Sequence, residues 1–428
     1  MLDINFIRGN SEIVKEAVRK KYMKVDIDRL LELDKERRRL IQEEESLRAQ
    51  QKHISEKLIK EKNKDDIEEA KSLKEKIKET KILLNAVEDE YQGLMLLVPN
   101  IPAEDTPVGP DETANRVVFE WGEIPKFDFG IKNHIQLGEK LDIIDIEAGV
   151  KVSGFRGYYL KKEGAALHFA LLWYAYQKIL KAGFQLLVGP TLVKEFVLTD
   201  SGYFPFGKEE AYQIGNPGKL ADGKTLGEPT YLTGTSEPTL IAYFADKVLN
   251  ENELPIRVCG FSPCYRSEAG SYGKDTQGLY RLHEFMKVEQ VVICKADTEE
   301  SNQWLETMRH ISEEILQDLK MSYRVVQNSS GDMGAGKYKM YDIETWMPSR
   351  NRYSETHSDS NLTDWQARRF NIKYRSSQGK THFAYTLNNT VLASPRILIA
   401  VLENYQQKDG SILVPEVLRE YTGFEKIG

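Results

Sequence analysis

Narrow apolar stripes run through the N-terminal part of the chain, where residues 27–92 contain neither Pro nor Gly and are dense in charged side chains. The first stripe repeats every seven residues, at Leu33, Leu40, Leu47 and Ile54. The second follows alternating steps of four and three, at Leu73, Ile77, Thr80, Leu84, Val87, Tyr91 and Leu94. This spacing predicts two long helices, each with a narrow buried seam.

The segment between the two stripes, 60–66, is polar, holds Asn63 and suits a turn. The simplest geometry is an antiparallel helical hairpin whose arms, of about 30 residues, project roughly 45 Å. Polar seam residues such as Arg37 and Glu44 weaken the alternative of a tight dimerisation coiled coil, but do not remove it. A merely solvated charged surface is a further alternative.

Prolines crowd the stretch between 99 and 110 and indicate a linker, so we divide the chain into residues 1–110 and 111–428. Beyond the linker, the pattern predicts helices over 167–182 and 298–319. Apolar, β-prone segments occupy 184–192, 257–265 and 285–294. Strands mixed with longer helices, without regular βαβ alternation, predict an α+β domain with a mostly antiparallel sheet flanked by helices.

Composition narrows the possible partners and the compartment. The net charge of −7 disfavours nucleic acid as a partner on global charge alone. We expect neither a membrane span nor a signal peptide, because no long apolar run occurs and residues 1–10 lack the required apolar core. The cysteines, Cys259, Cys264 and Cys294, match no disulfide framework or zinc signature, which favours core positions in a cytoplasmic protein.

The segment 257–294 reads as two strands around a polar loop from Ala269 to Tyr280. Strand alternation places Arg266 and Glu268 on one face, and Phe285, Lys287 and Glu289 together on a face of the returning strand. Charges beside an aromatic ring in a hairpin are costly unless solvated, paired or bound to a ligand. The pattern could offer an arginine fork for an anion and an aromatic surface for a flat base, although an exposed charged hairpin remains the alternative.

Two further clusters carry weaker signals. Thr235-Ser236-Glu237 precedes a helix and also fits an ordinary N-cap. Glu355-Thr356-His357-Ser358 supplies oxygen ligands that suit Mg²⁺, although surface loops rich in Ser and Asp are common.

A third cluster lies at a predicted helix start. Ser394 as N-cap and Pro395 as first helical residue place Arg396 in the first turn, where the helix dipole disfavours a cation unless an anion binds. By contrast, 331–337 imitates a phosphate-binding loop, but Tyr338 replaces the required hydroxyl residue and a β-prone segment follows. We therefore reject a phosphate-binding loop there.

Taken in order, these segments resemble the motifs of class II aminoacyl-tRNA synthetases, specifically the seryl-tRNA synthetase family. The matching strings are TSE at 235–237, YRSEAG at 265–270, DTQGLYRLHEFMKVE at 275–289, SNLTDWQARR at 360–369 and LENYQQKDGSILVPEVL at 402–418. Residues 183–190 resemble motif 1, which lies at the family's dimer interface, and the helical hairpin resembles its tRNA-binding arm. The resemblance covers essentially the whole chain.

The resemblance implies a role for each matching residue. The residues implied in catalysis are Arg266, Arg396 and Glu355. Those implied in serine binding are Thr235, Ser236, Glu237, Arg266, Glu289 and Thr390. Those implied in ATP binding are Arg266, Ser267, Glu268, Leu282, Phe285, Glu355, Thr356, His357, Ser358 and Arg396. Glu355 and Ser358 are also implied as Mg²⁺ ligands.

The implied reaction joins serine to ATP as seryl-adenylate and then transfers the seryl group to the 3′ end of tRNA(Ser), with tRNA(Sec) as a further candidate. The resemblance also implies a homodimer whose arm reaches tRNA on the other subunit. A ligase that loads a carrier protein should lack the arm. A non-catalytic paralogue should have lost Arg266, Glu289 or Arg396, and all three are present.

The chain departs from the bacterial pattern N-G-S-G-L-A-V-G-R before the last helix, where it has Asn388-Asn389-Thr390-Val391-Leu392-Ala393-Ser394-Pro395-Arg396. Asp359 also stands where relatives often have Cys. Thr390 keeps a hydroxyl, so we expect the reaction to be retained and these changes to bear on amino-acid discrimination.

Overall fold

A computed structural model describes residues 1–428 except 62, 217, 220, 226 and 270–277. The chain forms two compact units, Met1–Pro99 and Asn100–Gly428. The loop expected between Ala269 and Tyr280 falls largely outside the described residues.

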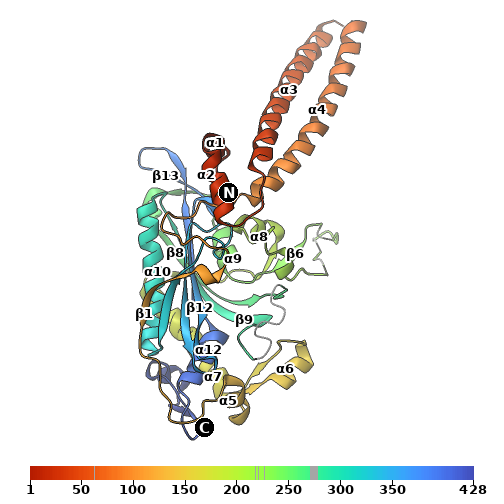
Figure 1. The fold of residues 1–428 in the computed structure, drawn as a ribbon. Coiled ribbons are helices and arrows are strands. Elements are labelled where there is room, and N and C mark those ends of the chain that lie inside the picture. The colour runs from red at the N-terminus through yellow and green to blue at the C-terminus, as the bar shows by residue number, and fades with distance from the viewer. Residues whose placement is uncertain (62, 217, 220, 226, 270–277) are drawn as a thin grey trace. The chain divides into compact units, whose positions relative to one another are not determined.

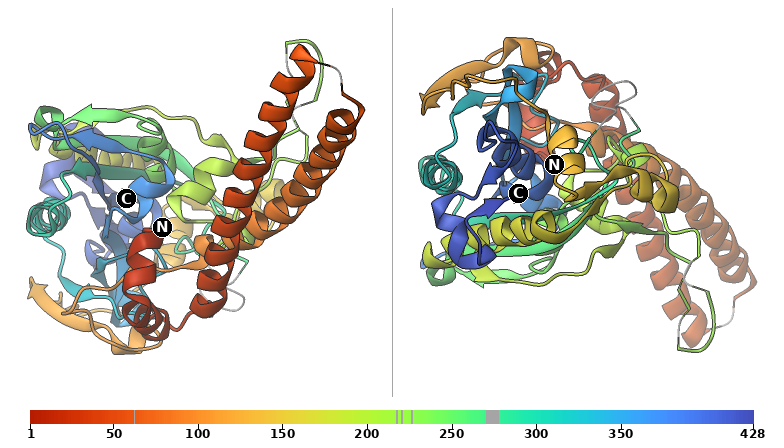
Figure 2. Two further views of the ribbon diagram at one scale, coloured as in Figure 1. Left: turned by 90° about the horizontal axis from the view of Figure 1, so that it is seen from above. Right: turned by 90° about the horizontal axis from the view of Figure 1, so that it is seen from below.

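The first unit contains the predicted helical hairpin. Two short helices, α1 (Ile4–Gly9) and α2 (Ser11–Lys20), precede the long helices α3 (Ile27–Lys60) and α4 (Lys64–Leu97), which run side by side (Figures 1 and 2). Asn63 caps α4, its side-chain oxygen accepting the Asp65 amide at 3.1 Å. Each long helix has 34 residues, which gives arms of about 50 Å.

The seam between α3 and α4 is buried along much of the predicted stripes. Leu33, Leu40 and Ile54 are buried on α3, and Leu73, Leu84 and Tyr91 on α4, with the hydroxyl of Thr80 among them. Cross-arm ion pairs flank the seam: Arg29 meets Glu90 at 2.8 Å and Arg37 meets Glu88 at 3.2 Å. The sequence prediction of a helical hairpin is confirmed.

An eight-stranded sheet is the centre of the second unit, with strand order β1-β10-β11-β12-β15-β9-β8-β4. Every neighbouring pair is antiparallel except β4 and β8, as the sequence predicted. The strands are β1 (Arg116–Trp121), β10 (Tyr323–Gln327), β11 (Lys339–Met347), β12 (Arg352–Thr363), β15 (Tyr385–Ala393), β9 (Glu284–Cys294), β8 (Ile256–Tyr265) and β4 (Gln185–Leu186).

Helices and short strands surround this sheet. The helices are α5 (His134–Lys140), α6 (Ile146–Ser153), α7 (Lys162–Lys181), α8 (Glu195–Ser201), α9 (Glu237–Ala242), α10 (Thr298–Asp318), α11 (Trp365–Arg369), α12 (Ser394–Asn404) and α13 (Arg419–Thr422). The short strands are β2 (Ile144–Asp145), β3 (Tyr159–Leu160), β5 (Leu192–Lys194), β6 (Thr230–Leu232), β7 (Val248–Asn250), β13 (Lys373–Arg375), β14 (Thr381–Phe383), β16 (Ile412–Leu413) and β17 (Lys426–Ile427).

The two faces of the sheet have different neighbours, with α10 and α9 on opposite sides (Figure 1). Towards α10, the side chains of Gln290 and Asn389 both donate to the Met308 carbonyl, at 2.9 and 3.0 Å. Towards α9, Val291 and Ile293 belong to an apolar cluster with residues of α9 and α11. Alternation along β9 therefore sends successive side chains to different environments.

The three cysteines lie on the central strands, Cys259 and Cys264 on β8 and Cys294 on β9, and all are buried and free. Burial raises the pKa of Cys259 to about 12. The prediction that they are core residues is confirmed. Within the part of the chain that the structure describes, every helix is too short or too polar to cross a lipid bilayer.

Two local predictions are wrong. The expected strand over 184–192 is divided into β4 and β5, because Val188 to Thr191 form no ladder. Ser394 is not the N-cap: Ala393 is, and Ser394 is the first residue of α12, with its hydroxyl against Nδ1 of His168. A buried imidazole thus takes the hydroxyl that would otherwise cap the helix.

Asp34 is a buried carboxylate whose loss should weaken the first unit. Its side chain is 1% exposed and is hydrogen-bonded by Arg8 at 2.7 Å and Arg38 at 3.2 Å. Burial raises the pKa of Asp34, but the two arginines outweigh burial and hold this pKa below its ordinary value. The ionised form therefore stabilises the fold at neutral pH, and this contribution disappears as the pH falls through that lowered pKa.

We expect Asp34→Asn to lower the free energy of unfolding of residues 1–99 by about 2 kcal/mol at pH 7. The difference from the parent should narrow below about pH 4, where the parent also loses the charge. Hydrogen exchange of α3 amides in the full chain measures this. Asp28→Asn, which changes an exposed carboxylate of the same helix, is the matched control; equal loss of protection in both variants would contradict the role of Asp34.

Candidate functional site

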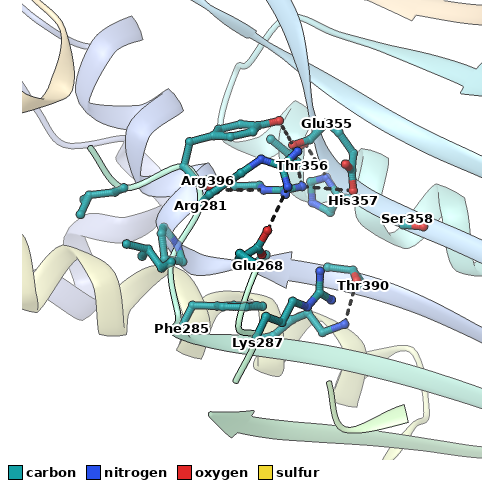
Figure 3. Close-up of a pocket in the computed structure, with 16 residues that line it drawn as sticks. Glu268, Arg281, Phe285, Lys287, Glu355, Thr356, His357, Ser358, Thr390 and Arg396 are labelled. Atoms are coloured by element: carbon teal, nitrogen blue, oxygen red, sulfur yellow. Dashed lines mark hydrogen bonds and ion pairs between the residues drawn. The ribbon is translucent and has the colours of Figure 1, made fainter. Parts of the chain in front are cut away.

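A cavity of about 180 Å³ opens on the α9 side of the sheet, between β9, β12, β15 and the start of α12 (Figure 3). Its walls combine cations, carboxylates, hydroxyls and aromatic rings. The lining residues assigned from sequence are Arg266, Glu268, Leu282, Phe285, Glu355, Thr356, His357, Ser358, Thr390 and Arg396. Residues from four separate motifs therefore meet in one place.

Strand β9 supplies the floor of the cavity. Phe285 and Lys287 line it, as alternation predicted, and Glu289 lies further along the strand, 2% exposed. Lys287 Nζ is 2.6 Å from Glu289 Oε2 and donates to Thr390 Oγ1 at 3.1 Å, and that hydroxyl donates to Glu289 at 3.2 Å. Burial raises the pKa of Glu289, and Lys287 opposes that rise.

Arg266 and Glu268 line the cavity, but not as neighbours on a strand. Strand β8 ends at Tyr265, and Glu268 has a left-handed backbone with φ of 54°. Arg266 Nε donates to the Gly234 carbonyl at 3.3 Å, and its guanidinium carbon lies 5.4 Å from the centre of the Phe285 ring. Glu268 meets Arg281 at 3.1 Å. The prediction that the pair shares a strand face is wrong, because the strand stops before it.

Ser267 differs from its neighbours. It is absent from the cavity wall, and its hydroxyl donates to the Glu209 carbonyl at 2.8 Å. Leu282, at the other end of the incompletely described loop, lines the cavity and is 3% exposed.

The cluster 355–358 lies on strand β12, not on a surface loop. A bulge at Thr356 interrupts the pairing with β11, since Ile343 faces His357 while Glu344 faces Glu355. The extra residue resets the alternation, so Glu355 and Ser358 point to the same side. Asp342 of β11 is the strand partner of Ser358, and its carboxyl group interacts with both Ser358 and Glu355.

Arg396 connects this cluster to the start of α12. One guanidinium nitrogen, Nη1, is 3.1 Å from Glu355 Oε1 and 3.2 Å from the Glu355 carbonyl. Nε donates to the Tyr280 carbonyl at 3.5 Å, and the Tyr280 hydroxyl donates to the Glu355 carbonyl at 3.0 Å. An arginine in a first helical turn is thus held by a carboxylate and two carbonyls, which offsets the unfavourable dipole.

His357 lines the cavity but is unsuited to carry a proton at neutral pH. It is 1% exposed, and burial lowers its pKa to about 3. Its Nδ1 is 2.9 Å from the Thr356 hydroxyl, which also donates to the Ile343 carbonyl at 3.1 Å. Both residues therefore shape the wall.

Thr235, Ser236 and Glu237 are buried at the start of α9, beside the carbonyl that binds Arg266. Glu237 accepts from the Tyr203 hydroxyl at 2.9 Å and from the side-chain amides of Gln366 and Asn388, each at 3.0 Å. Three donors around one carboxylate mark a fixed acceptor group. The three residues do not line the 180 Å³ cavity itself.

The departures from the bacterial pattern have different positions. Thr390 faces the cavity, whereas Asn389 faces α10, where it also donates to the Ser312 hydroxyl at 2.8 Å. Asp359 pairs with Asn389 across the strands, so it shares the α10 face and lies behind the site.

Sequence reasoning missed several cavity residues. The sequence places Lys287 on the face of Phe285 and Glu289 but assigns it no role in the site, although this spacing is a sufficient signal for one. Tyr280 ends the loop and Arg281 follows it, and no periodicity marks either residue. Asp342 enters only through the register of β11 with β12, which the sequence does not reveal.

The oxygen set formed by Asp342, Glu355 and Ser358 fits a divalent cation. Burial and the charge of Glu355 raise the pKa of Asp342 well above its ordinary value, and a cation would relieve that repulsion. Among the described residues no group of three or more His, Cys, Asp or Glu side chains forms a metal cage. Two carboxylates and a hydroxyl are typical of Mg²⁺ that completes its shell with phosphates and water.

Residues 1–102 match the family model of the seryl-tRNA synthetase N-terminal domain, and residues 221–405 match that of the tRNA synthetase class II core domain (G, H, P, S and T). Serine–tRNA ligases of Deinococcus radiodurans and Treponema denticola are 42% and 40% identical to this chain. The matches span all of this chain and 99% and 100% of the two relatives, respectively.

Two solved structures are similar over the whole chain. A seryl-tRNA synthetase from Pyrococcus horikoshii complexed with ATP has a TM-score of 0.86 at 34% identity, with 99% of that chain covered. A cytoplasmic serine–tRNA ligase from Naegleria fowleri in complex with AMP has a TM-score of 0.85 at 32% identity, with 98% covered.

The ion pair of Lys287 with Glu289 generates a prediction about stability. Lys287→Met leaves Glu289 as an uncompensated buried carboxylate, whose pKa rises further. Because the folded state then holds the proton more tightly than the unfolded state, stability falls as the pH rises above about 4.5. We expect a loss of about 3 kcal/mol at pH 8 and a smaller loss at pH 5.

Urea unfolding at the two pH values measures this loss. The matched control is Lys287→Met combined with Glu289→Gln, which removes the charge and should abolish the difference between pH 5 and pH 8. A single variant whose loss does not depend on pH would refute the assignment.

Proposed function

Because the chain belongs to the seryl-tRNA synthetase family, we propose that the residues around the 180 Å³ cavity bind ATP and serine and that the α3–α4 hairpin binds tRNA. The activity is that of a serine–tRNA ligase. The observation that carries the residue assignments is the convergence of two arginines, an aromatic ring and a hydroxyl–carboxylate pair on one face of the sheet.

The first step forms seryl-adenylate. A serine carboxylate oxygen bonds to the α-phosphorus of ATP, the bond from that phosphorus to the bridging oxygen breaks, and pyrophosphate leaves. No protein nucleophile is required, so catalysis rests on alignment and on neutralisation of phosphate charge. Arg266, close to Phe285, is suited to hold the α-phosphate and the serine carboxylate through its planar fork.

The nucleotide lies between the remaining groups. Phe285 offers its ring to adenine, with Leu282 beside it, and Glu268 accepts from the base. Arg396 exchanges part of its contact with Glu355 for the γ-phosphate. Glu355 and Ser358, with Asp342 adjacent, would hold Mg²⁺, which supplies charge neutralisation to the phosphates when bound.

Serine selection rests on Glu289 and Thr390. The two residues are hydrogen-bonded to each other, which supports a role in which both contact the substrate hydroxyl. Alanine would leave this buried pair without its partner, which is the basis of discrimination against it. Thr235 and Glu237 are suited to the serine amino group, because Glu237 is a buried, fixed acceptor.

The second step moves the seryl group to tRNA. A ribose hydroxyl at the 3′ end attacks the carbonyl carbon of the adenylate, AMP leaves with the bonding electrons of the broken C–O bond, and the hydroxyl proton is released. The chain carries a net charge of −7, so binding of tRNA depends on the shape and local charge of the hairpin more than on global attraction.

A homodimer is part of the proposal, with each arm serving the site of the other subunit. Apolar side chains lie exposed around α7 and β4, at Phe169, Trp173, Leu186 and Val188, where a second copy would cover them. Residues 183–190 are also those that resemble motif 1. We further propose a cytoplasmic location, in keeping with three free cysteines.

Glu289→Ala should reduce serine-dependent ATP–pyrophosphate exchange at least about 100-fold, because it removes a charged hydrogen-bond acceptor. Glu284→Ala, an exposed carboxylate of the same strand, is the matched control and should keep normal exchange. Near-normal exchange in the Glu289 variant would defeat the serine-binding assignment.

Replacement of residues 30–95 by a short Gly-Ser linker should separate the two steps. Exchange should stay within about threefold of the parent, because the second unit has its own core, while charging of tRNA should be lost. Parallel assays of exchange and of aminoacylation with total tRNA measure both. Equal loss of the two activities in a folded variant would argue against an arm dedicated to tRNA.

A further inference from the structure

His134 lies between helix α12 and the segment that follows Gly278, and its ring contacts both. It is the first residue of α5 and is 6% exposed. Its Nδ1 is 2.9 Å from Glu403 Oε1 on α12, and its backbone amide donates to the same oxygen at 3.0 Å. The other oxygen of Glu403 accepts from the Ser349 amide at 3.0 Å, so this carboxylate is held in place on both sides.

The opposite ring nitrogen has a different partner. His134 Nε2 accepts a hydrogen bond from the backbone amide of Leu279 at 3.1 Å. An acceptor nitrogen carries no proton, so the ring is the neutral tautomer with its hydrogen on Nδ1, directed at Glu403. Both oxygens of Glu403 accept hydrogen bonds, Oε1 from His134 and Oε2 from the Ser349 amide, which fixes the carboxylate as an acceptor.

Leu279 begins the segment 279–282, all of which lines the cavity. Its next residue, Tyr280, is bound to Arg396 through its carbonyl and to Glu355 through its hydroxyl. Arg396 and Glu403 lie on one face of α12, about two turns apart. The helix therefore holds this segment directly through Arg396 and indirectly through Glu403 and His134.

The backbone at Gly278 is adapted to this contact. It has φ of 78°, and a Cβ there would lie 2.2 Å from His134 Nε2. A side chain at this position would displace the imidazole from the Leu279 amide. Glycine thus allows the close approach of the chain to the ring.

We propose that His134 is a positioning residue for nucleotide binding: held by Glu403, it fixes the Leu279 amide and with it the cavity wall 279–282. The inference rests on the proposed function only in taking ATP as the occupant of that wall. The groups assigned to serine, such as Glu289 and Thr390, lie on the strands and have other partners. His134 should therefore affect ATP and not serine.

Two variants separate this role from general stabilisation. In His134→Asn the amide nitrogen replaces Nδ1 and keeps the bond to Glu403, but the side chain is too short to reach Leu279. In His134→Gln the amide is one methylene further out and can accept from the Leu279 amide. Both are polar and neutral, so a role limited to filling space predicts the same behaviour for the two.

ATP binding by calorimetry without serine, together with the KM values for ATP and serine in pyrophosphate exchange, tests the proposal. We expect His134→Asn to raise the Kd and KM for ATP about tenfold, as for one lost hydrogen bond, with the KM for serine within about twofold. His134→Gln should remain within about threefold of the parent.

A Kd for ATP in His134→Asn within twofold of the parent would overturn the proposal, and so would a Gln variant as weak as the Asn variant. A rise in both KM values together would likewise assign His134 a general structural role. If the parent chain binds ATP but shows no serine-dependent exchange, the proposed function is refuted. The role of His134 can then still be judged from the Kd values for ATP.

Discussion

Strand β15 lies between β9 and β12, and its register with both strands decides which side chains enter the site. Thr390 faces Glu289 across the β9–β15 pair, and one residue earlier Asn389 faces Gln290. Because side chains alternate, a slip of one residue would exchange the hydroxyl–carboxylate pair for the amides that belong under α10. The hydrogen bonds of Asn389 and Gln290 to the Met308 carbonyl oppose such a slip. Contacts on the α10 face of the sheet therefore keep Thr390 and Glu289 on the opposite face, at the site.

The carboxylates assigned to ATP and serine each have a partner within the protein. Glu289 has Lys287, Glu355 has Arg396, and Glu237 has three neutral donors. A buried charge that already has partners can be exposed to a ligand without reorganising the protein, since the ligand replaces or joins a contact that exists. This arrangement explains how a sheet surface of opposing charges remains folded before either substrate binds.

Periodicity predicted the regular elements, and local irregularities escaped it. The hairpin, the turn at Asn63 and the common face of Phe285, Lys287 and Glu289 follow from the sequence pattern alone. The bulge at Thr356 and the left-handed backbone of Glu268 depend on tertiary packing, so strand alternation could not place Ser358 or Glu268 correctly. His134 lies 145 positions from Leu279, and no pattern within the sequence connects the two. The roles of the site residues are implied by the resemblance, and the structure places most of these residues around one cavity.

The cysteines have a consequence for labelling experiments on the helical hairpin. All three are enclosed by the central strands, and burial raises their pKa values, so little thiolate is available for alkylation. A cysteine introduced at an exposed arm position such as Ile59, which is 85% exposed, would react first. The wild-type background can therefore serve directly for fluorescent or spin labelling of the hairpin tip, without removal of native thiols.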